Sequence, residues 1–265
     1  MKLLPMRSLG RTGLDVSCLG LGTVKFGRNQ GVKYPSGFQL PDDQSVLNIL
    51  SICREAGMNL IDTAPAYGHS EERLGQLLRE REHWKICTKV GEEFENGQSN
   101  FDFSAKHTRT SVERSLRRLK TDYLDIVLVH SDGNDSDIIE HSDCFASLEK
   151  LRDEGYIRAF GMSTKTLAGG LLAIERADIV MVTYRPEEPD EQRVIDTALQ
   201  KNKGVLIKKA LNSGHLSGAN SNVDPVRASM NFIYGHPGVG SIIIGSITPT
   251  HLRQNIAHAI AAATL

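Results

Sequence analysis

The chain has 265 residues, of which 40% are hydrophobic and 24% are charged, and its formal net charge is −1 at pH 7. This length suits one α/β barrel, and the near-neutral charge gives no reason to expect a nucleic acid or an anionic membrane as partner. The sequence has no run of 18 apolar residues and no signal-like start, so we expect no membrane span and a cytoplasmic protein.

The first predicted element is a β-hairpin over residues 6–17. Polar and apolar residues alternate on both sides of Arg11-Thr12-Gly13, which supplies the turn. The hairpin comes directly before the first strand of a longer repeating pattern. We therefore expect it to cover one end of the sheet that those later strands form.

After the hairpin, short apolar strands alternate with amphipathic helices. Strands are predicted at residues 16–23, 59–65, 85–91, 123–130, 157–164, 177–184, 204–211 and 241–247. Helices are predicted at residues 42–57, 104–120, 144–155, 166–176, 191–202, 226–235 and 250–263. Strands that alternate with helices pair in parallel, and eight of them favour a closed barrel. The prediction is a (β/α)8 TIM barrel with an N-terminal β-hairpin capping its bottom, and residues 1–265 as one domain.

The cysteines predict neither a metal site nor a disulfide. Cys18, Cys53, Cys87 and Cys144 are widely spaced and form no Cys-x-x-Cys pair. We expect reduced thiols in the core, as is usual in a cytoplasmic protein.

Polar side chains stand at the ends of three consecutive predicted strands. Asp62 ends the second strand, Lys89 lies near the end of the third, and His130 ends the fourth. Because side chains alternate along a strand, all three are expected to face the barrel axis. Neighbouring strands lie about 4.8 Å apart, so the long Lys89 side chain can reach Asp62 and form an ion pair. Tyr67, on the loop after Asp62, can fold back over that pair.

This set of side chains suits the reduction of a carbonyl group. A free tyrosine has a pKa of about 10, and a nearby ammonium lowers it. We therefore expect Tyr67 to act as general acid and Lys89 to lower its pKa. Asp62 is expected to hold Lys89 charged. A neutral His130 is expected to donate a hydrogen bond to the substrate oxygen.

At these residues the sequence resembles the aldo-keto reductase family, over essentially the whole chain. The motifs that carry the resemblance are RSLGRTGLDVS, LIDTAPAYGHSE, CTKVG, SLRRLKTDYLDIVLVH and GYIRAFGMS. The resemblance implies an oxidoreductase that transfers a hydride between NAD(P)H and a carbonyl or alcohol substrate (an aldehyde, ketone or sugar). It also implies a nicotinamide cofactor bound without a Rossmann fold, and no G-x-G-x-x-G motif follows any predicted strand.

The resemblance further implies which residues meet the cofactor at the barrel mouth. Those expected near the nicotinamide, its ribose and the pyrophosphate are Gly22, Thr23, Asp62, Ser163, Thr164, Lys208, Leu211 and Ser213. Those expected near the adenosine phosphate, where the last helix begins, are Gly245, Ser246, Thr248, His251, Gln254 and Asn255. A helix N-terminus attracts phosphate through its free N–H groups and its dipole.

Several positions depart from the family pattern. Thr164 stands where asparagine is usual, and Met181 stands where glutamine is common. Lys208 and Lys209 stand where a tyrosine often stacks on the nicotinamide. His251 stands where an arginine often meets a 2′-phosphate. NADP(H) is expected to be preferred over NAD(H).

The long loop after the first barrel strand is the expected substrate wall. It covers residues 23–41, and loops of this length in compact domains are usually functional. Phe26, Tyr34 and Phe38 are its aromatic candidates. We expect a small-molecule carbonyl substrate, with no nucleic acid, membrane or metal, and the sequence does not indicate an oligomeric state.

Two other functions stay open at this point. The chain could be a regulatory subunit that binds a nicotinamide cofactor with little turnover. It could also be a class I aldolase-like barrel, in which Lys89 or Lys208 forms a Schiff base.

Overall fold

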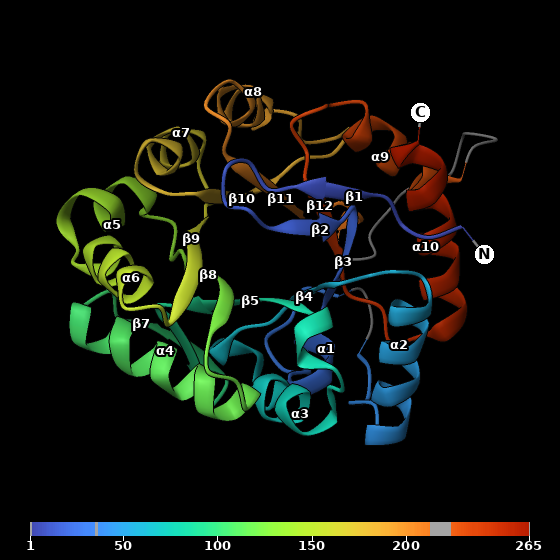
Figure 1. Cartoon of the computed structure of the whole chain (residues 1–265), viewed down its shortest axis with the longest axis horizontal. Coiled ribbons are helices and arrows are strands. Elements are labelled where there is room, and N and C mark those ends of the chain that lie inside the picture. Colours follow the sequence, from blue (N-terminus) through green and yellow to red (C-terminus); the bar gives the residue numbers. More distant parts are fainter. Residues whose placement is uncertain (1, 35–36, 213–223, 265) are drawn as a thin grey trace.

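The computed structural model describes residues 2–34, 37–212 and 224–264 (Figure 1). Its centre is a closed barrel of parallel strands, in which the last strand pairs with the first. In barrel order the strands are β3 (Leu19–Gly22), β4 (Leu60–Asp62), β5 (Lys85–Val90), β8 (Leu124–His130), β9 (Ile157–Ser163), β10 (Ile179–Thr183), β11 (Gly204–Lys208) and β12 (Ser241–Ile244). The predicted (β/α)8 TIM barrel is confirmed.

Helices form the outer layer around this barrel (Figure 1). They are α1 (Val24–Gly27), α2 (Asp43–Glu55), α3 (Ser70–Leu77), α4 (Ala105–Leu119), α5 (Asp135–His141), α6 (Cys144–Asp153), α7 (Leu167–Arg176), α8 (Gln192–Gln200), α9 (Pro225–Tyr234) and α10 (Pro249–Ala263), with 3-10 turns η1 (Pro65–Tyr67) and η2 (Arg81–His83). The sequence pattern misses α1, α3 and α5, because helices of four to eight residues show too little periodicity. Among the described residues no helix is long and apolar enough to cross a membrane.

Side-chain caps explain where several of the helices begin. Asp42 accepts a hydrogen bond from the Ser45 amide at 2.8 Å, and Ser104 accepts one from the His107 amide at 3.2 Å. Such caps satisfy amide groups that lack a partner in the first turn of a helix. They fix the starts of α2 and α4 at Asp43 and Ala105, one residue after the predicted starts.

The N-terminal hairpin closes one end of the barrel. Its strands, β1 (Met6–Ser8) and β2 (Asp15–Ser17), pair antiparallel. Leu9, Leu14 and Val16 are buried and join a cluster made by the inward-facing residues of the barrel strands. The hairpin therefore fills the end opposite the strand carboxyl termini, which confirms the predicted cap.

A second hairpin follows β5 and was outside the predicted pattern. Its strands are β6 (Glu92–Glu95) and β7 (Gln98–Phe101). The turn between them is Asn96-Gly97, and both residues have positive φ, 52° and 81°. Asn-Gly is the strongest short-range hairpin signal, so this element could have been found in the sequence. All four cysteines are buried and free, as expected.

Candidate active site

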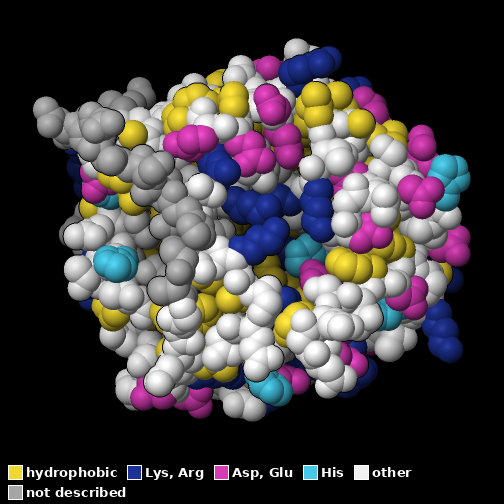
Figure 2. Space-filling view, turned by 180° about the vertical axis from the view of Figure 1, so that it is seen from behind, with side chains coloured by type: hydrophobic (Ala, Val, Ile, Leu, Met, Phe, Trp, Pro, Cys, Tyr) yellow, Lys and Arg dark blue, Asp and Glu magenta, His cyan; other side chains and the backbone are white. Residues whose placement is uncertain are grey.

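A cavity of about 670 Å³ opens at the carboxyl ends of the barrel strands. Each strand contributes at least one residue to its wall: Gly22, Asp62, Lys89, His130, Ser163, Met181, Lys208 and Ile243. Figure 2, which views this end of the molecule, shows Lys and Arg side chains gathered around the central hollow. Lysines that line the cavity are Lys25, Lys89, Lys165, Lys208 and Lys209. The site therefore suits an anionic ligand.

Asp62 and Lys89 form a buried ion pair in the cavity wall. Lys89 Nζ donates to Asp62 Oδ1 at 2.6 Å and to the Thr63 carbonyl at 2.8 Å. Only 2% of the Lys89 side chain and 5% of the Asp62 side chain are exposed. Burial alone would lower the pKa of Lys89, but Asp62, with smaller contributions from Tyr67 and Cys87, raises that pKa above its ordinary value. The ammonium is therefore fixed in place and stays protonated.

Tyr67 lies over this pair, as expected. Its ring centroid is 4.8 Å from Lys89 Nζ, and it meets the His130 ring edge-to-face at 6.3 Å. Burial raises the pKa of Tyr67, and the Lys89 ammonium opposes that rise without overcoming it. The expectation that Lys89 leaves Tyr67 more acidic than a free tyrosine is thus wrong for the net pKa, because burial of the phenol dominates. At neutral pH the phenol keeps its proton.

Two glycines allow the Tyr67 turn to approach the loop after β3. A Cβ added to Gly68, which has φ of +60°, would lie 2.2 Å from the Gly27 carbonyl oxygen. A Cβ on Gly27 would lie 2.4 Å from the Tyr67 carbonyl oxygen. No larger residue fits at either position. The close approach between the Tyr67 turn and α1, which holds Tyr67 in the cavity wall, therefore depends on glycine.

His130 ends β8 and faces the cavity, but its nearest charged neighbour is one that the sequence pattern missed. Oε2 of Glu92 lies 2.6 Å from His130 Nδ1. Burial lowers the pKa of His130, and the Lys89 and Lys208 charges add to this effect, while Glu92 opposes it. Burial would raise the pKa of Glu92, but the contact with His130 lowers it to about 2. Glu92 is therefore ionised at neutral pH.

Most residues expected at the cofactor do lie around this cavity. Those in its wall are Gly22, Asp62, Ser163, Lys208, Leu211, Gly245, Ser246, Thr248, His251, Gln254 and Asn255. Thr23 is buried behind the wall, where its hydroxyl donates to the Asp62 carbonyl at 2.9 Å. Ser213 lies outside the described residues.

Lys208, at the end of β11, reaches past β10 and bonds to the end of β9. Its Nζ donates to Ser163 Oγ at 2.9 Å and to the Thr164 carbonyl. Burial lowers the pKa of Lys208 to about 8, against the attraction of Glu191. Lys208 therefore lies in the cavity wall and already uses two of its hydrogens on the protein.

Thr164, which was expected at the cofactor, does not line the cavity: the residue is fully buried, and its Oγ1 has no hydrogen-bond partner among the described residues. One feature at the start of α10 does fit a nicotinamide cofactor. Thr248, the residue before α10, makes no side-chain cap, which leaves the first amides of that helix available to a phosphate. Within the described part of the chain, no cluster of three or more His, Cys, Asp or Glu residues could hold a metal ion.

The first loop contributes to the cavity differently from the prediction. Tyr34 lines the cavity; Phe38, which was also expected there, does not line it but packs edge-to-face on Tyr34 with ring centroids 5.6 Å apart. Lys25, which was not predicted, also lines the cavity and lies 3.9 Å from the Tyr34 ring centroid. Phe26 does not line it: the side chain is fully buried in the core between barrel and helices. The turn of α1 directs Phe26 inward, so the expectation of a substrate contact there is corrected.

Known proteins resemble this chain along its length. The profile of the Aldo/keto reductase family matches residues 18–228. A solved structure of a putative aldo-keto reductase from Pseudomonas aeruginosa is 53% identical, with a TM-score of 0.90 over 98% of this chain and 97% of that chain. An uncharacterized oxidoreductase of Bacillus subtilis is 28% identical over 94% of this chain and 89% of its own length. The NADH-specific methylglyoxal reductase of Escherichia coli is 34% identical over 61% of this chain and 51% of its own length. The chain belongs to the Aldo/keto reductase family, a family of oxidoreductases.

Proposed function

We propose that this chain reduces a small carbonyl compound with NAD(P)H, and that Tyr67 donates the proton. The observation that carries the proposal is the shared cavity of Tyr67, the buried Lys89–Asp62 pair and His130. Membership of an oxidoreductase family supports the reaction class. The substrate would be an aldehyde, a ketone or a sugar, and the same site would serve the reverse oxidation of an alcohol.

The residues that would hold the cofactor are those at the strand ends and at the start of α10. Ser163 would meet the nicotinamide carboxamide, and Ser246 with the first amides of α10 would meet a phosphate. When bound, the reduced nicotinamide supplies the hydride that reaches the carbonyl carbon.

The chain's own contribution is a positioned proton. Burial keeps the Tyr67 phenol protonated, so it can donate to the carbonyl oxygen as negative charge develops there. The Lys89 ammonium, 4.8 Å from the Tyr67 ring centroid, then stabilises the phenolate that remains. Asp62 keeps Lys89 charged and in place through the 2.6 Å contact.

We propose that NADP(H) is preferred over NAD(H). The lysines in the cavity wall favour the more highly charged cofactor, and His251 and Gln254 line the wall at the start of α10. An NADH-specific relative keeps NAD(H) as the alternative. Fluorescence titration with both reduced cofactors checks this, and a tighter Kd for NADH would contradict it.

A Tyr67→Phe variant tests the proposed proton donor. We expect kcat to fall by about 100-fold or more, because positioned general acids contribute on that order, while the Kd for the reduced cofactor changes little. Tyr156→Phe is the matched control, since Tyr156 is exposed and absent from the cavity wall. Near-normal turnover of Tyr67→Phe with intact cofactor binding would refute the proposal.

One observation favours a second candidate, an aldolase-like Schiff base on Lys208. A half-buried lysine in the cavity wall whose pKa is lowered to about 8 is the type that forms such adducts, whereas the raised pKa of Lys89 keeps that residue protonated. Borohydride treatment in the presence of carbonyl compounds, followed by mass spectrometry, tests whether Lys208 forms a Schiff base. Absence of an adduct removes the aldolase, and a lack of NAD(P)H oxidation across the same compounds would favour a regulatory subunit.

A further inference from the structure

The side chain of Lys208 brings a positive charge close to the proposed reaction centre. Ser163 on β9 is the register partner of His130 on β8, and neighbouring strands lie about 4.8 Å apart. Lys208 Nζ donates to Ser163 Oγ at 2.9 Å and to the Thr164 carbonyl. Burial lowers the pKa of His130, and the charge of Lys208 adds to that effect. The Lys208 ammonium therefore acts on the part of the cavity wall that Tyr67 and His130 share.

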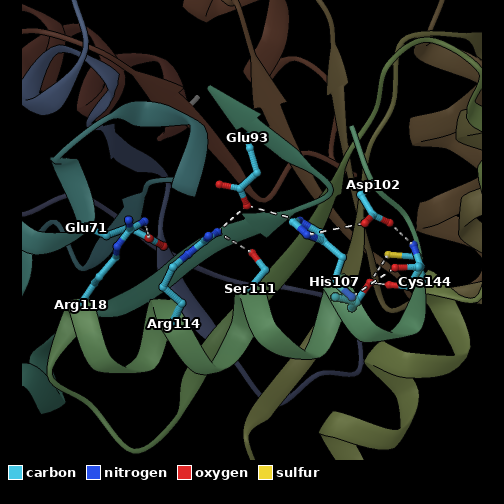
Figure 3. Close-up of polar contacts among 10 residues, drawn as sticks. Glu71, Glu93, Asp102, His107, Ser111, Arg114, Arg118 and Cys144 are labelled. Atoms are coloured by element: carbon cyan, nitrogen blue, oxygen red, sulfur yellow. Dashed lines mark hydrogen bonds and ion pairs between the residues drawn. The ribbon is translucent and has the colours of Figure 1, made fainter. Parts of the chain in front are cut away.

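The charge of Lys208 is not cancelled by a carboxylate in contact with it. A half-buried cation often lies against a carboxylate, as Arg114 of α4 does against Glu93 (Figure 3). Lys208 donates instead to a hydroxyl and a carbonyl, and with the described residues it makes no ion pair. Its attraction to Glu191 acts over a longer distance. The ammonium is therefore able to attract or repel a ligand in the cavity.

The other charged and titratable groups around Lys208 leave this corner of the cavity positive. They are Glu191 before α8, Asp135 at the start of α5, Lys165 after β9, His130 at the end of β8, and Lys209, the next residue. Burial raises the pKa of Glu191 to about 7, so this carboxyl group is only partly ionised at neutral pH. Three lysines therefore outweigh two carboxyl groups.

A nicotinamide ring differs in charge between its two oxidation states. The reduced ring is neutral and the oxidised ring carries one positive charge, while the phosphates are the same in both. For the proposed reaction the ring must lie where a hydride can reach a carbonyl carbon whose oxygen meets Tyr67. That position is beside His130 and Ser163, and so close to the Lys208 ammonium. Two like charges at roughly 6 Å in a partly solvated site change a binding constant by about tenfold or more.

We propose that Lys208 makes the site select the reduced cofactor over the oxidised one, because its ammonium repels the positive charge of the oxidised nicotinamide ring. This inference rests on the proposed function. In that reaction the hydride goes to the carbonyl carbon and the Tyr67 proton goes to its oxygen, which leaves an alcohol and NAD(P)+. The ammonium attracts the phosphates of both cofactor forms, so only the ring separates them. Lys208 thus weakens the binding of NAD(P)+ relative to NAD(P)H and favours its release after the carbonyl has been reduced.

The first test compares the two cofactor forms by binding alone. Isothermal titration calorimetry at pH 6.5 gives Kd for NADP+ and for NADPH, and their ratio removes whatever the adenosine and the phosphates contribute. We expect Lys208→Met to lower the ratio of the NADP+ Kd to the NADPH Kd by about tenfold. Lys208→Arg keeps the charge and most of the ratio, and Lys201→Met at an exposed position is the control.

A lysine that only supports the fold would weaken the binding of both cofactor forms alike. An unchanged ratio in Lys208→Met therefore overturns the proposal. A ratio that falls equally in Lys208→Arg overturns it as well, since the charge would then not be the cause.

The second test removes the charge from the wild-type protein by raising the pH. Burial lowers the pKa of Lys208 to about 8, so the side chain is mostly charged at pH 6.5 and mostly neutral at pH 9. The same ratio of Kd values is expected to fall by about tenfold over this range. Glu191 becomes ionised over the same range and would also lower the ratio. Lys208→Arg separates the two, because arginine stays charged at pH 9 and keeps the ratio high.

Equal falls in the wild type and Lys208→Arg would assign the effect to Glu191 and overturn the proposal. A wild-type ratio that does not change with pH overturns it too, and leaves the proposed function intact. If neither NADPH nor NADP+ binds, the proposed function fails and this inference fails with it.

Discussion

Lys208 is half-buried in the cavity wall and is attracted by the carboxylate of Glu191. Burial lowers the pKa of Lys208 to about 8 and raises the pKa of Glu191 to about 7. Glu191 Oε2 is buried and has no hydrogen-bond partner among the described residues. Both groups therefore change charge close to physiological pH, next to the residues proposed to hold the nicotinamide.

This gives a prediction for cofactor binding. The Kd for NAD(P)H is expected to rise by about tenfold from pH 7 to pH 9, since one unit above its pKa only about one Lys208 in ten keeps the proton that attracts the anion. Lys208→Met should bind weakly at pH 7 and show little of this pH dependence. Titration by cofactor fluorescence measures both, with exposed Lys201→Met as control. An unchanged slope in Lys208→Met would contradict the assignment.

At the scale of elements, Asp135 connects the start of α5 to the start of α7. Its Oδ2 accepts hydrogen bonds from the amides of Lys165 and Thr166, at 2.8 and 2.7 Å, and Ser131 donates to Oδ1. A Cβ on Gly169 would lie 2.0 Å from the Asp135 Cβ, so α7 packs directly against this residue. The Asp135 carboxylate thus fixes the backbone of the loop from which Lys165 reaches the cavity wall.

Removing this carboxylate should weaken the whole fold. We expect Asp135→Ala to lower the free energy of unfolding by about 2–4 kcal/mol, because the Ser131 hydroxyl and the amides of Lys165 and Thr166 lose a buried acceptor. Asp137→Ala on the same helix is the control, since its side chain is 77% exposed and its ion pair with His141 is a surface pair. Urea unfolding followed by circular dichroism compares them. Equal losses in the two variants would show that burial of Asp135 contributes nothing.

The barrel and the tetrad of Asp62, Tyr67, Lys89 and His130 could be predicted because they follow from local rules. Strand alternation assigns a face to each strand end, and parallel pairing brings the ends together. Glu92 could not be placed in that way. It reaches His130 only because Gly91, with φ of +98°, turns the chain back into a hairpin. Phe26 was misplaced for a related reason: the direction of a loop side chain depends on a short helical turn that has no periodic pattern.

At the scale of the whole molecule, the barrel needs its N-terminal hairpin as part of its core. Leu9 is fully buried. It lies against Gly204 and Gly240, where an added Cβ would come within 3.1 and 2.5 Å of Leu9 atoms. Arg7 donates to the Val239 carbonyl at 2.9 Å and so ties the hairpin to the residues before β12. The first residues thus stabilise segments that are more than 190 positions away.

Shortening Leu9 should leave a void inside the barrel. We expect Leu9→Ala to lower the free energy of unfolding by about 2–5 kcal/mol, the usual range for a buried leucine. Leu3→Ala is the matched control, because Leu3 is 62% exposed. Thermal and urea unfolding measure the difference. A loss no larger than that of Leu3→Ala would show that the hairpin is not part of the barrel core.

The pairing of β3 with β12 has a consequence for the order of events during synthesis. Residues 19–21 pair with residues 242–244, so one edge of β3 has no partner until almost the whole chain has left the ribosome. An unpaired, fully apolar strand edge is a site for pairing with other chains. The nascent protein therefore carries this exposed edge throughout translation, and chains that stop before residue 241 should be the ones that aggregate or need a chaperone.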